Sequence, residues 1–248
     1  MKIDELYKRY FTIRKCVSCG DFLDYEERDA VYCQDCRLRW SVEKTKECKI
    51  CMRSAVECTC QPKELAAVGS LCLRKLVFYD KNPKTTSPQM RTVYRLKRKP
   101  HARAEKYIAH EFSHLIEKEL GAIGVVNSAD EAVVTSVPRG RISRRKYGID
   151  QSERIAAAIG AEMGIPCVKA FCRAKFFSDE QKKLSRKERF KNIKRQLVLA
   201  DGADVSGRYV ILYDDIVTTG ASMTACTSLL YKAGAKGVIS VCITKNQG

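Results

Sequence analysis

The sequence predicts an α/β protein with a parallel sheet, preceded by a small cysteine-rich, zinc-ribbon-like module. Strand-length apolar runs alternate with helical segments between residues 63 and 248. Three of these runs are continuously apolar, as expected for parallel strands that are covered on both faces. Eight of the 13 cysteines lie between Cys16 and Cys60, and Pro62 marks the boundary that we expect between residues 1–62 and residues 63–248.

The elements of the larger region follow from the apolar runs and from helix stop signals. Gly164 and Pro166 end the first helix, and Gly234 ends the second. We expect strands at 71–79, 132–137, 167–172, 208–213 and 237–244, and helices at 151–163 and 222–233. In a sheet of this kind, ligands bind beyond the carboxyl ends of the strands.

The net charge of +17 is concentrated in the larger region, where 34 Lys and Arg face 18 Asp and Glu. Such an excess predicts an anionic partner, either nucleic acid or a polyphosphate. There is no apolar run of membrane-spanning length, and the first residues are charged. We therefore expect a cytoplasmic protein without membrane insertion.

The clustered cysteines have the spacing of zinc ligands. A C-x2-C pair directs two thiolates at one tetrahedral ion, and a second pair completes the shell. All-sulfur ligation indicates a closed, structural site. One or two Zn²⁺ ions are expected, and the spacing leaves open whether the pairs form separate sites or interleave. The eight candidate ligands are Cys16, Cys19, Cys33, Cys36, Cys48, Cys51, Cys58 and Cys60. The other five cysteines are expected to be small buried side chains.

The segment "YVILYDDIVTTGASMT", residues 209–224, combines an apolar strand, two carboxylates and a row of small residues. Asp214 and Asp215 are expected at the carboxyl end of the strand, where they can accept hydrogen bonds from vicinal hydroxyls. The turn at 218–222 and the first amides of the next helix predict a phosphate cradle. A sugar monophosphate meets both demands. The chain has no P-loop motif, which excludes a P-loop ATPase.

"VILYDDIVTTGAS" resembles the phosphoribosyl-pyrophosphate (PRPP) signature of the type I phosphoribosyltransferases. With the cysteine clusters, the chain resembles the ComF family (ComFC and GntX-like proteins), which is linked to competence and DNA uptake. "VPRGRISRRKYGIDQSERIAAAIG" is similar to that family's V-P stretch and its R-G-[FY]-N-Q segment, with Tyr147 in place of the arginine. Farther along, four residues fit the family spacing Q-x2-L-x4-R-x2-N, namely Gln181, Leu184, Arg189 and Asn192.

The resemblance implies a Mg²⁺-dependent enzyme that displaces pyrophosphate from PRPP, with an acceptor that the sequence does not name. Asp214 and Asp215 would hold the ribose hydroxyls and help to bind Mg²⁺, and would be the catalytic pair. Residues 173–195 would form a hood over the site. The 5′-phosphate would be held by Thr218, Thr219, Gly220, Ala221 and Ser222. The pyrophosphate loop would contain Arg139 and Gly140, and Lys97 matches a family lysine that we expect to face the substrate.

The alternative is a non-catalytic adaptor that senses PRPP and binds single-stranded DNA. This chain has Tyr147 where the family has an arginine. One positive charge that would stabilise the departing pyrophosphate is therefore absent. Residues 81–106, 139–146 and 182–195 carry 9, 5 and 8 Lys and Arg, more than one PRPP requires. Neighbouring aromatic residues could stack on unpaired bases or belong to the core. These five are Tyr79, Tyr94, Phe176, Phe177 and Phe190. Competence and DNA-uptake proteins would be further partners.

Residues 110–114, "HEFSH", match the zinc-protease motif H-E-x-x-H. Helical periodicity places His110 and His114 opposite the apolar arc that contains Ile108, Phe112 and Ile116. No histidine follows His114 in the sequence to serve as the third zinc ligand. We therefore expect a solvated helix face and reject the protease hypothesis.

Overall fold

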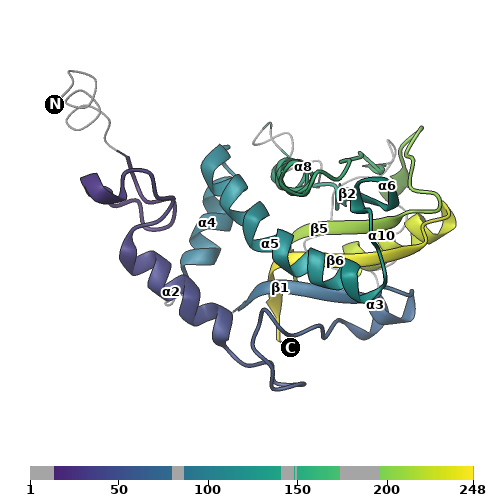
Figure 1. Ribbon diagram of the computed structural model, residues 1–248, viewed down its shortest axis with the longest axis horizontal. Helices are drawn as coiled ribbons and strands as arrows, with labels where there is room; N and C mark the ends of the chain where they lie inside the picture. The colour runs from purple at the N-terminus through teal and green to yellow at the C-terminus, as the bar shows by residue number, and fades with distance from the viewer. Residues whose placement is uncertain (1–13, 80–86, 141–147, 149, 174–195, 248) are drawn as a thin grey trace.

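A four-stranded parallel sheet lies at the centre of the structure, a computed structural model that describes residues 14–79, 87–140, 148, 150–173 and 196–247 (Figure 1). The strand order is β1-β6-β5-β2, and all three pairings are parallel. The strands are β1 (Cys72–Tyr79), β6 (Gly237–Asn246), β5 (Tyr209–Val217) and β2 (Ala132–Ser136). Because β5 and β6 are central and covered on both faces, each contains a buried, mostly apolar run, residues 210–213 in β5 and 238–243 in β6.

Helices cover both faces of this sheet. On one face, α5 (Ala102–Ala122) and α8 (Gln151–Met163) pack on alternate strand residues such as Ile211 and Tyr213. On the other face, α10 (Ala221–Lys232) and α3 (Lys63–Ala67) pack on the intervening residues, such as Val210 and Leu212. Figure 1 shows α5 crossing in front of the strands. This alternation is the period-2 pattern of a strand that is buried on both sides.

The long helices begin and end where the sequence provides caps. The Asp150 carboxylate accepts a hydrogen bond from the Glu153 amide at the start of α8, and Gly164 ends that helix with φ +67°. In α5, the apolar stripe of Ile108, Phe112 and Ile116 is fully buried. Shorter helical segments are α4 (Pro88–Leu96) and α6 (Ser128–Glu131) in the α/β region and the 3-10 helix η1 (Tyr25–Glu27) in the N-terminal segment.

The N-terminal segment shares a core with the α/β region. Trp40 on α2 (Gln34–Thr45) stacks on Tyr32. Both rings also form T-shaped contacts with Tyr107 of α5. Both Tyr32 and Trp40 are almost completely buried. Aromatic pairs of this kind add to the stability supplied by their buried area. Packing of α2 against α5 therefore fixes the first cysteines relative to the sheet.

Most expected elements are confirmed, but the interpretation of residues 167–172 as a further sheet strand is wrong. Cys167 makes only an isolated bridge to Val134. The chain then turns away, and β3 (Phe171–Arg173) pairs antiparallel with β4 (Leu197–Leu199) in a separate two-stranded sheet. Apolar character predicted an extended segment but could not identify its pairing partner. Cys167 and Cys172 are also exposed, contrary to expectation, whereas Cys72, Cys226 and Cys242 are buried.

The expected hood, residues 173–195, lies almost entirely outside the described residues, as do Tyr147, Phe176, Phe177 and Phe190. Within the described ranges, no helix combines the length and the apolar character that crossing a membrane requires.

Candidate functional site

A cavity of about 230 Å³ opens where β2 ends and where β5 carries its two aspartates. It joins four separate parts of the chain, namely the end of α4, the segment after β2, the start of α8, and the region from β5 to α10. Its lining consists of Lys97, Val137, Pro138, Arg139, Gly140, Ser152, Asp214, Asp215 and Ser222. The structure therefore brings together six of the residues expected to bind PRPP.

The two carboxylates lie within β5, because this strand continues to Val217 and does not end at Tyr213 as expected. Asp215 donates its backbone N–H to Oδ1 of Asp214 at 2.9 Å. Burial, followed by the charge of Asp215, raises the pKa of Asp214 to about 8. The site thus holds two adjacent, half-buried acids. Such crowding favours binding of a cation or of hydroxyl donors.

One cation contacts these acids, and a second lines the same cavity. The Lys97 ammonium lies 2.8 Å from Oδ2 of Asp215. Arg139 donates from Nη1 to the Lys97 carbonyl at 3.1 Å, and its backbone N–H donates to Oδ2 of Asp150 at 3.1 Å. Asp150 therefore caps α8 and also positions the segment after β2. The cavity therefore combines acids with cations, as a Mg²⁺-bound polyphosphate requires.

Residues 218–222, called here the phosphate loop, connect β5 to α10. Gly220 caps α10 with φ +76°, a left-handed conformation that favours glycine. The Ala221 amide contacts Oγ1 of Thr219 at 3.4 Å, and the Thr224 amide makes the first helical bond to the Gly220 carbonyl. Ser222 lines the cavity, whereas Thr218 is exposed and Gly220 and Ala221 are buried. Thr218, Thr219, Gly220 and Ala221 are not among the lining residues.

Sequence reasoning missed Asp150 and Ser152 as site residues. Ser152 lines the cavity, and Asp150 holds the backbone of Arg139. The available signal was the spacing of Asp150 and Glu153, which is typical of a capped helix N-terminus. Helix N-termini attract anions, so this pattern could have indicated a second wall of the site.

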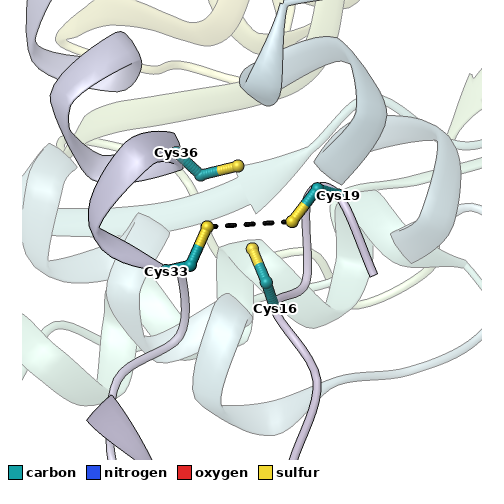
Figure 2. Close-up of side chains that lie close together, drawn as sticks. All are labelled: Cys16, Cys19, Cys33 and Cys36. Atoms are coloured by element: carbon teal, nitrogen blue, oxygen red, sulfur yellow. Dashed lines mark hydrogen bonds between the residues drawn. The ribbon is translucent and has the colours of Figure 1, made fainter. Parts of the chain in front are cut away.

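The eight clustered cysteines form two separate groups of four. Cys16, Cys19, Cys33 and Cys36 make the first cysteine cluster, and Figure 2 shows their sulfur atoms pointing toward one another. The second cysteine cluster consists of Cys48, Cys51, Cys58 and Cys60. Within each group, all sulfur atoms lie within 4.8 Å of one another. The pairing that spacing left open is therefore sequential and not interleaved.

Both clusters begin with the same turn. The residue after the first C-x2-C pair of each cluster has positive φ, +91° at Gly20 and +58° at Met52. Its amide donates to the carbonyl of the first cysteine, Cys16 at 3.0 Å or Cys48 at 2.9 Å. This turn directs both sulfur atoms of a pair toward one point.

The geometry fits zinc. Four sulfurs at about 2.3 Å from a tetrahedral ion lie roughly 3.8 Å apart. The Sγ atoms of Cys19 and Cys33, joined by the dashed line in Figure 2, are 3.7 Å apart. Either cluster could bind one Zn²⁺ with a complete shell of thiolates and no open position for a substrate.

Within the "HEFSH" segment of α5, the two histidines are exposed and Phe112 is buried. Nδ1 of His110 lies 2.9 Å from Oε1 of Glu162, and Glu111 forms an ion pair with Lys44. In the part of the chain that the structure describes, the two cysteine clusters are the only groups of three or more potential metal ligands. Rejection of the protease hypothesis is consistent with this arrangement, because the required general base is already paired.

A larger cavity, about 710 Å³, lies between the first cysteine cluster and the α4–α5 connection. Among the residues that the structure describes, no acidic side chain lines it. Its six cationic residues are Arg14, Lys15, Arg95, Arg98, Lys99 and Arg103. Burial and the nearby Arg14 charge lower the pKa of Arg103. Cations gathered in this way favour an anion in the cavity.

Residues 149–248 match the family model of the phosphoribosyl transferase domain. The C-terminal part of the chain is therefore a phosphoribosyltransferase-type domain, and the matched range contains both aspartates and the phosphate loop. Lys97, Arg139 and Gly140 reach the same cavity from outside this range. No curated protein sequence matches the chain.

Three solved structures illustrate the structural similarity. Glutamine PRPP amidotransferase from B. subtilis is 19% identical over 56% of this chain and 26% of that protein, with a TM-score of 0.35. PRPP synthetase from Mycobacterium smegmatis is 22% identical over 52% and 32%, with a TM-score of 0.32. Hypoxanthine phosphoribosyl transferase from Trypanosoma cruzi is 14% identical over 57% and 64%, with a TM-score of 0.38. The chain thus spans about a quarter to a third of the first two proteins.

Proposed function

We propose that this protein binds PRPP with Mg²⁺ in the cavity between β2 and β5 and acts as a phosphoribosyltransferase. The observation that carries this proposal is the joint lining of one cavity by Asp214, Asp215, Lys97, Arg139 and Ser222. These side chains offer ligands for a divalent cation and ribose hydroxyls together with donors for phosphate oxygens. The domain match over residues 149–248 supports the same ligand class.

In the proposed reaction, the bond from the anomeric carbon to pyrophosphate breaks and a bond from the acceptor forms. Asp214 and Asp215 hold the ribose hydroxyls and would help to hold Mg²⁺, which when bound would supply charge neutralisation at the pyrophosphate. Lys97 and Arg139 stabilise the departing pyrophosphate, and the phosphate loop holds the 5′-phosphate. The acceptor is a nucleophile that the site leaves unspecified.

We also propose that each cysteine cluster holds one structural Zn²⁺. The two repeated turns and the convergence of four sulfurs in each cluster support this assignment. The ions would stabilise the N-terminal segment, and catalysis would take place at the separate carboxylate site.

The second candidate function is a PRPP-sensing adaptor for single-stranded DNA. The cation-lined cavity between α4 and the first cysteine cluster supports it, because Arg98 and Lys99 of its lining follow Lys97 directly in the sequence. A role in DNA uptake, with other competence proteins as partners, would follow from the ComF resemblance. DNA binding of this kind should weaken steeply as salt rises, and release of pyrophosphate with any acceptor would favour the transferase.

Calorimetric titration of PRPP with Mg²⁺ tests the shared part of both proposals. The Asp214→Asn/Asp215→Asn double variant should lose binding, whereas the exposed Asp204→Asn variant should bind like wild type. Equal binding by wild type and the double variant would reject the site. A pyrophosphate-release assay across nucleobases then separates the transferase from the adaptor.

A further inference from the structure

The second cysteine cluster contacts the phosphate loop through Pro62. Cys58 and Cys60 belong to this cluster, and Pro62 follows two residues later. A Cβ atom built on Gly220 would lie 2.8 Å from Cγ of Pro62. The proline ring is therefore packed against the backbone of the loop, at the residue that adopts the left-handed conformation.

Lys75 ties the same segment to the sheet. This lysine of β1 is completely buried. Its ammonium donates to the Cys58 carbonyl at 2.7 Å, to the Cys60 carbonyl at 3.2 Å and to the Cys58 sulfur at 3.1 Å. A buried ammonium is costly unless an anion and hydrogen-bond acceptors surround it. Four thiolates on one Zn²⁺ carry net negative charge, so the loaded cluster is the partner that Lys75 requires.

The chain beyond Pro62 continues along α10, the helix that the phosphate loop begins. Leu65 of α3 belongs to the same buried cluster as Met223 and Leu230 of α10. The Tyr231 hydroxyl donates to the Gly69 carbonyl at 2.6 Å. Residues 58–69 therefore form a continuous brace, fixed at one end by the second cysteine cluster and packed at the other end on α10.

We propose that the second cysteine cluster, when it holds zinc, positions the phosphate loop, with Lys75 and Pro62 as the positioning residues. Loss of the ion removes the anchor of residues 58–60 and the counter-charge of Lys75. Pro62 then no longer confines Gly220, and the loop amides lose their fixed direction. Only the consequence for PRPP rests on the proposed function, because the effect on the loop backbone follows from the contacts alone.

The first cysteine cluster supplies a matched control. Arg95 of α4 donates to the carbonyls of Cys16 and Cys19, which lie in the equivalent turn. This cluster is thus attached to α4, whereas the second is attached to the phosphate loop. Cys51→Ser and Cys19→Ser are the same change at the same position of each turn, and both leave residues 58–62 unaltered.

Hydrogen exchange of the amides at 218–224, measured by mass spectrometry beside the zinc content, tests the proposal. Each serine variant should bind one zinc fewer than wild type. Cys51→Ser should speed exchange at 218–224 by about tenfold, the scale expected when one local packing contact is lost. Cys19→Ser should leave this exchange near wild type. Unchanged exchange in Cys51→Ser, or equal acceleration in both variants, would overturn the proposal.

Pro62→Gly and Lys75→Met keep the test decisive if Cys51→Ser does not fold. Pro62→Gly should retain two zinc ions and still accelerate exchange at 218–224. Lys75→Met should release zinc from the second cluster to a chelator sooner than wild type does.

With PRPP, Pro62→Gly should raise Kd about tenfold at unchanged zinc content, the effect of losing one close packing contact. A wild type that does not bind PRPP would reject the proposed function, while the exchange data would still decide this inference. Exchange at 218–224 that is as slow in Pro62→Gly as in wild type would contradict the proposed role of Pro62.

Discussion

Lys97 and Asp215 form an ion pair of 2.8 Å across the candidate site, joining the end of α4 to β5. Both side chains are largely buried, with 25% and 14% of their surface exposed. The pair places one cation against two adjacent carboxylates. Through this ion pair, Lys97, which precedes the matched residues 149–248, becomes part of the candidate site.

Substitution Lys97→Met should weaken Mg²⁺-dependent PRPP binding by about 10- to 100-fold, the loss expected for one charge-assisted hydrogen bond. The control is Lys99→Met, whose side chain lines the other cavity. Calorimetry on both variants measures the difference. A Kd unchanged in Lys97→Met would remove this lysine from the site.

Substitution Asp214→Asn should stabilise the protein, and by more at high pH. The pKa of Asp214 is about 8 in the folded chain against an ordinary value of 3.8. The folded state therefore keeps a proton that the unfolded state releases, and wild-type stability falls as pH rises from about 4 to 8. Asn does not ionise, so the variant escapes this loss. Between pH 5 and pH 9, the advantage should grow by roughly 4 kcal/mol.

Urea denaturation across this range measures the effect, with Asp204→Asn as the exposed control. A constant difference between Asp214→Asn and wild type at every pH would mean that Asp214 does not titrate in this window.

Substitution Gly220→Ala should destabilise the chain by about 1–3 kcal/mol and weaken PRPP binding, because φ is +76° and the new methyl group meets Pro62. Gly124→Ala is a matched control, since Gly124 has φ +77° and nothing within 4 Å of the new methyl group. Thermal denaturation of both variants separates the backbone cost from the clash. Equal losses would show that the contact with Pro62 contributes nothing.

Metal analysis should find two zinc ions per chain, and alkylation of the cysteines should release both. The His110→Ala/His114→Ala variant should retain both ions, because these histidines contact Glu162 and Glu117 and belong to neither cluster. Removing zinc should lower Tm, as expected for ions that hold a small module together. A third ion lost with the histidines would revive the protease hypothesis.

Local sequence patterns predicted the elements of the fold well, because burial on both faces leaves a continuous apolar run. The helix at 151–163 agrees with α8 at both ends, since Gly164 and the Asp150 cap are local signals. Pairing was less predictable. The segment at 167–172 has strand-like residues, but its antiparallel partner at 197–199 lies beyond residues 174–195, and local pattern does not encode that distant contact.

The site was predictable where a single segment carries the chemistry, as in Asp214, Asp215 and Ser222. Lys97, Arg139 and Gly140 came from a family resemblance, and the fold gathers them into the same cavity. The roles of Lys75 and Pro62 could not be read from the sequence. Lys75 interrupts a buried strand, and only the position of the second cysteine cluster beside β1 gives that charge a partner.

A structure of the protein with PRPP and Mg²⁺ tests the central claim most directly. The account predicts the ribose beside Asp214 and Asp215, the 5′-phosphate against residues 218–222, and the pyrophosphate toward Lys97 and Arg139. PRPP bound elsewhere, for example in the cation-lined cavity beside α4, with the carboxylate cavity empty, would contradict it.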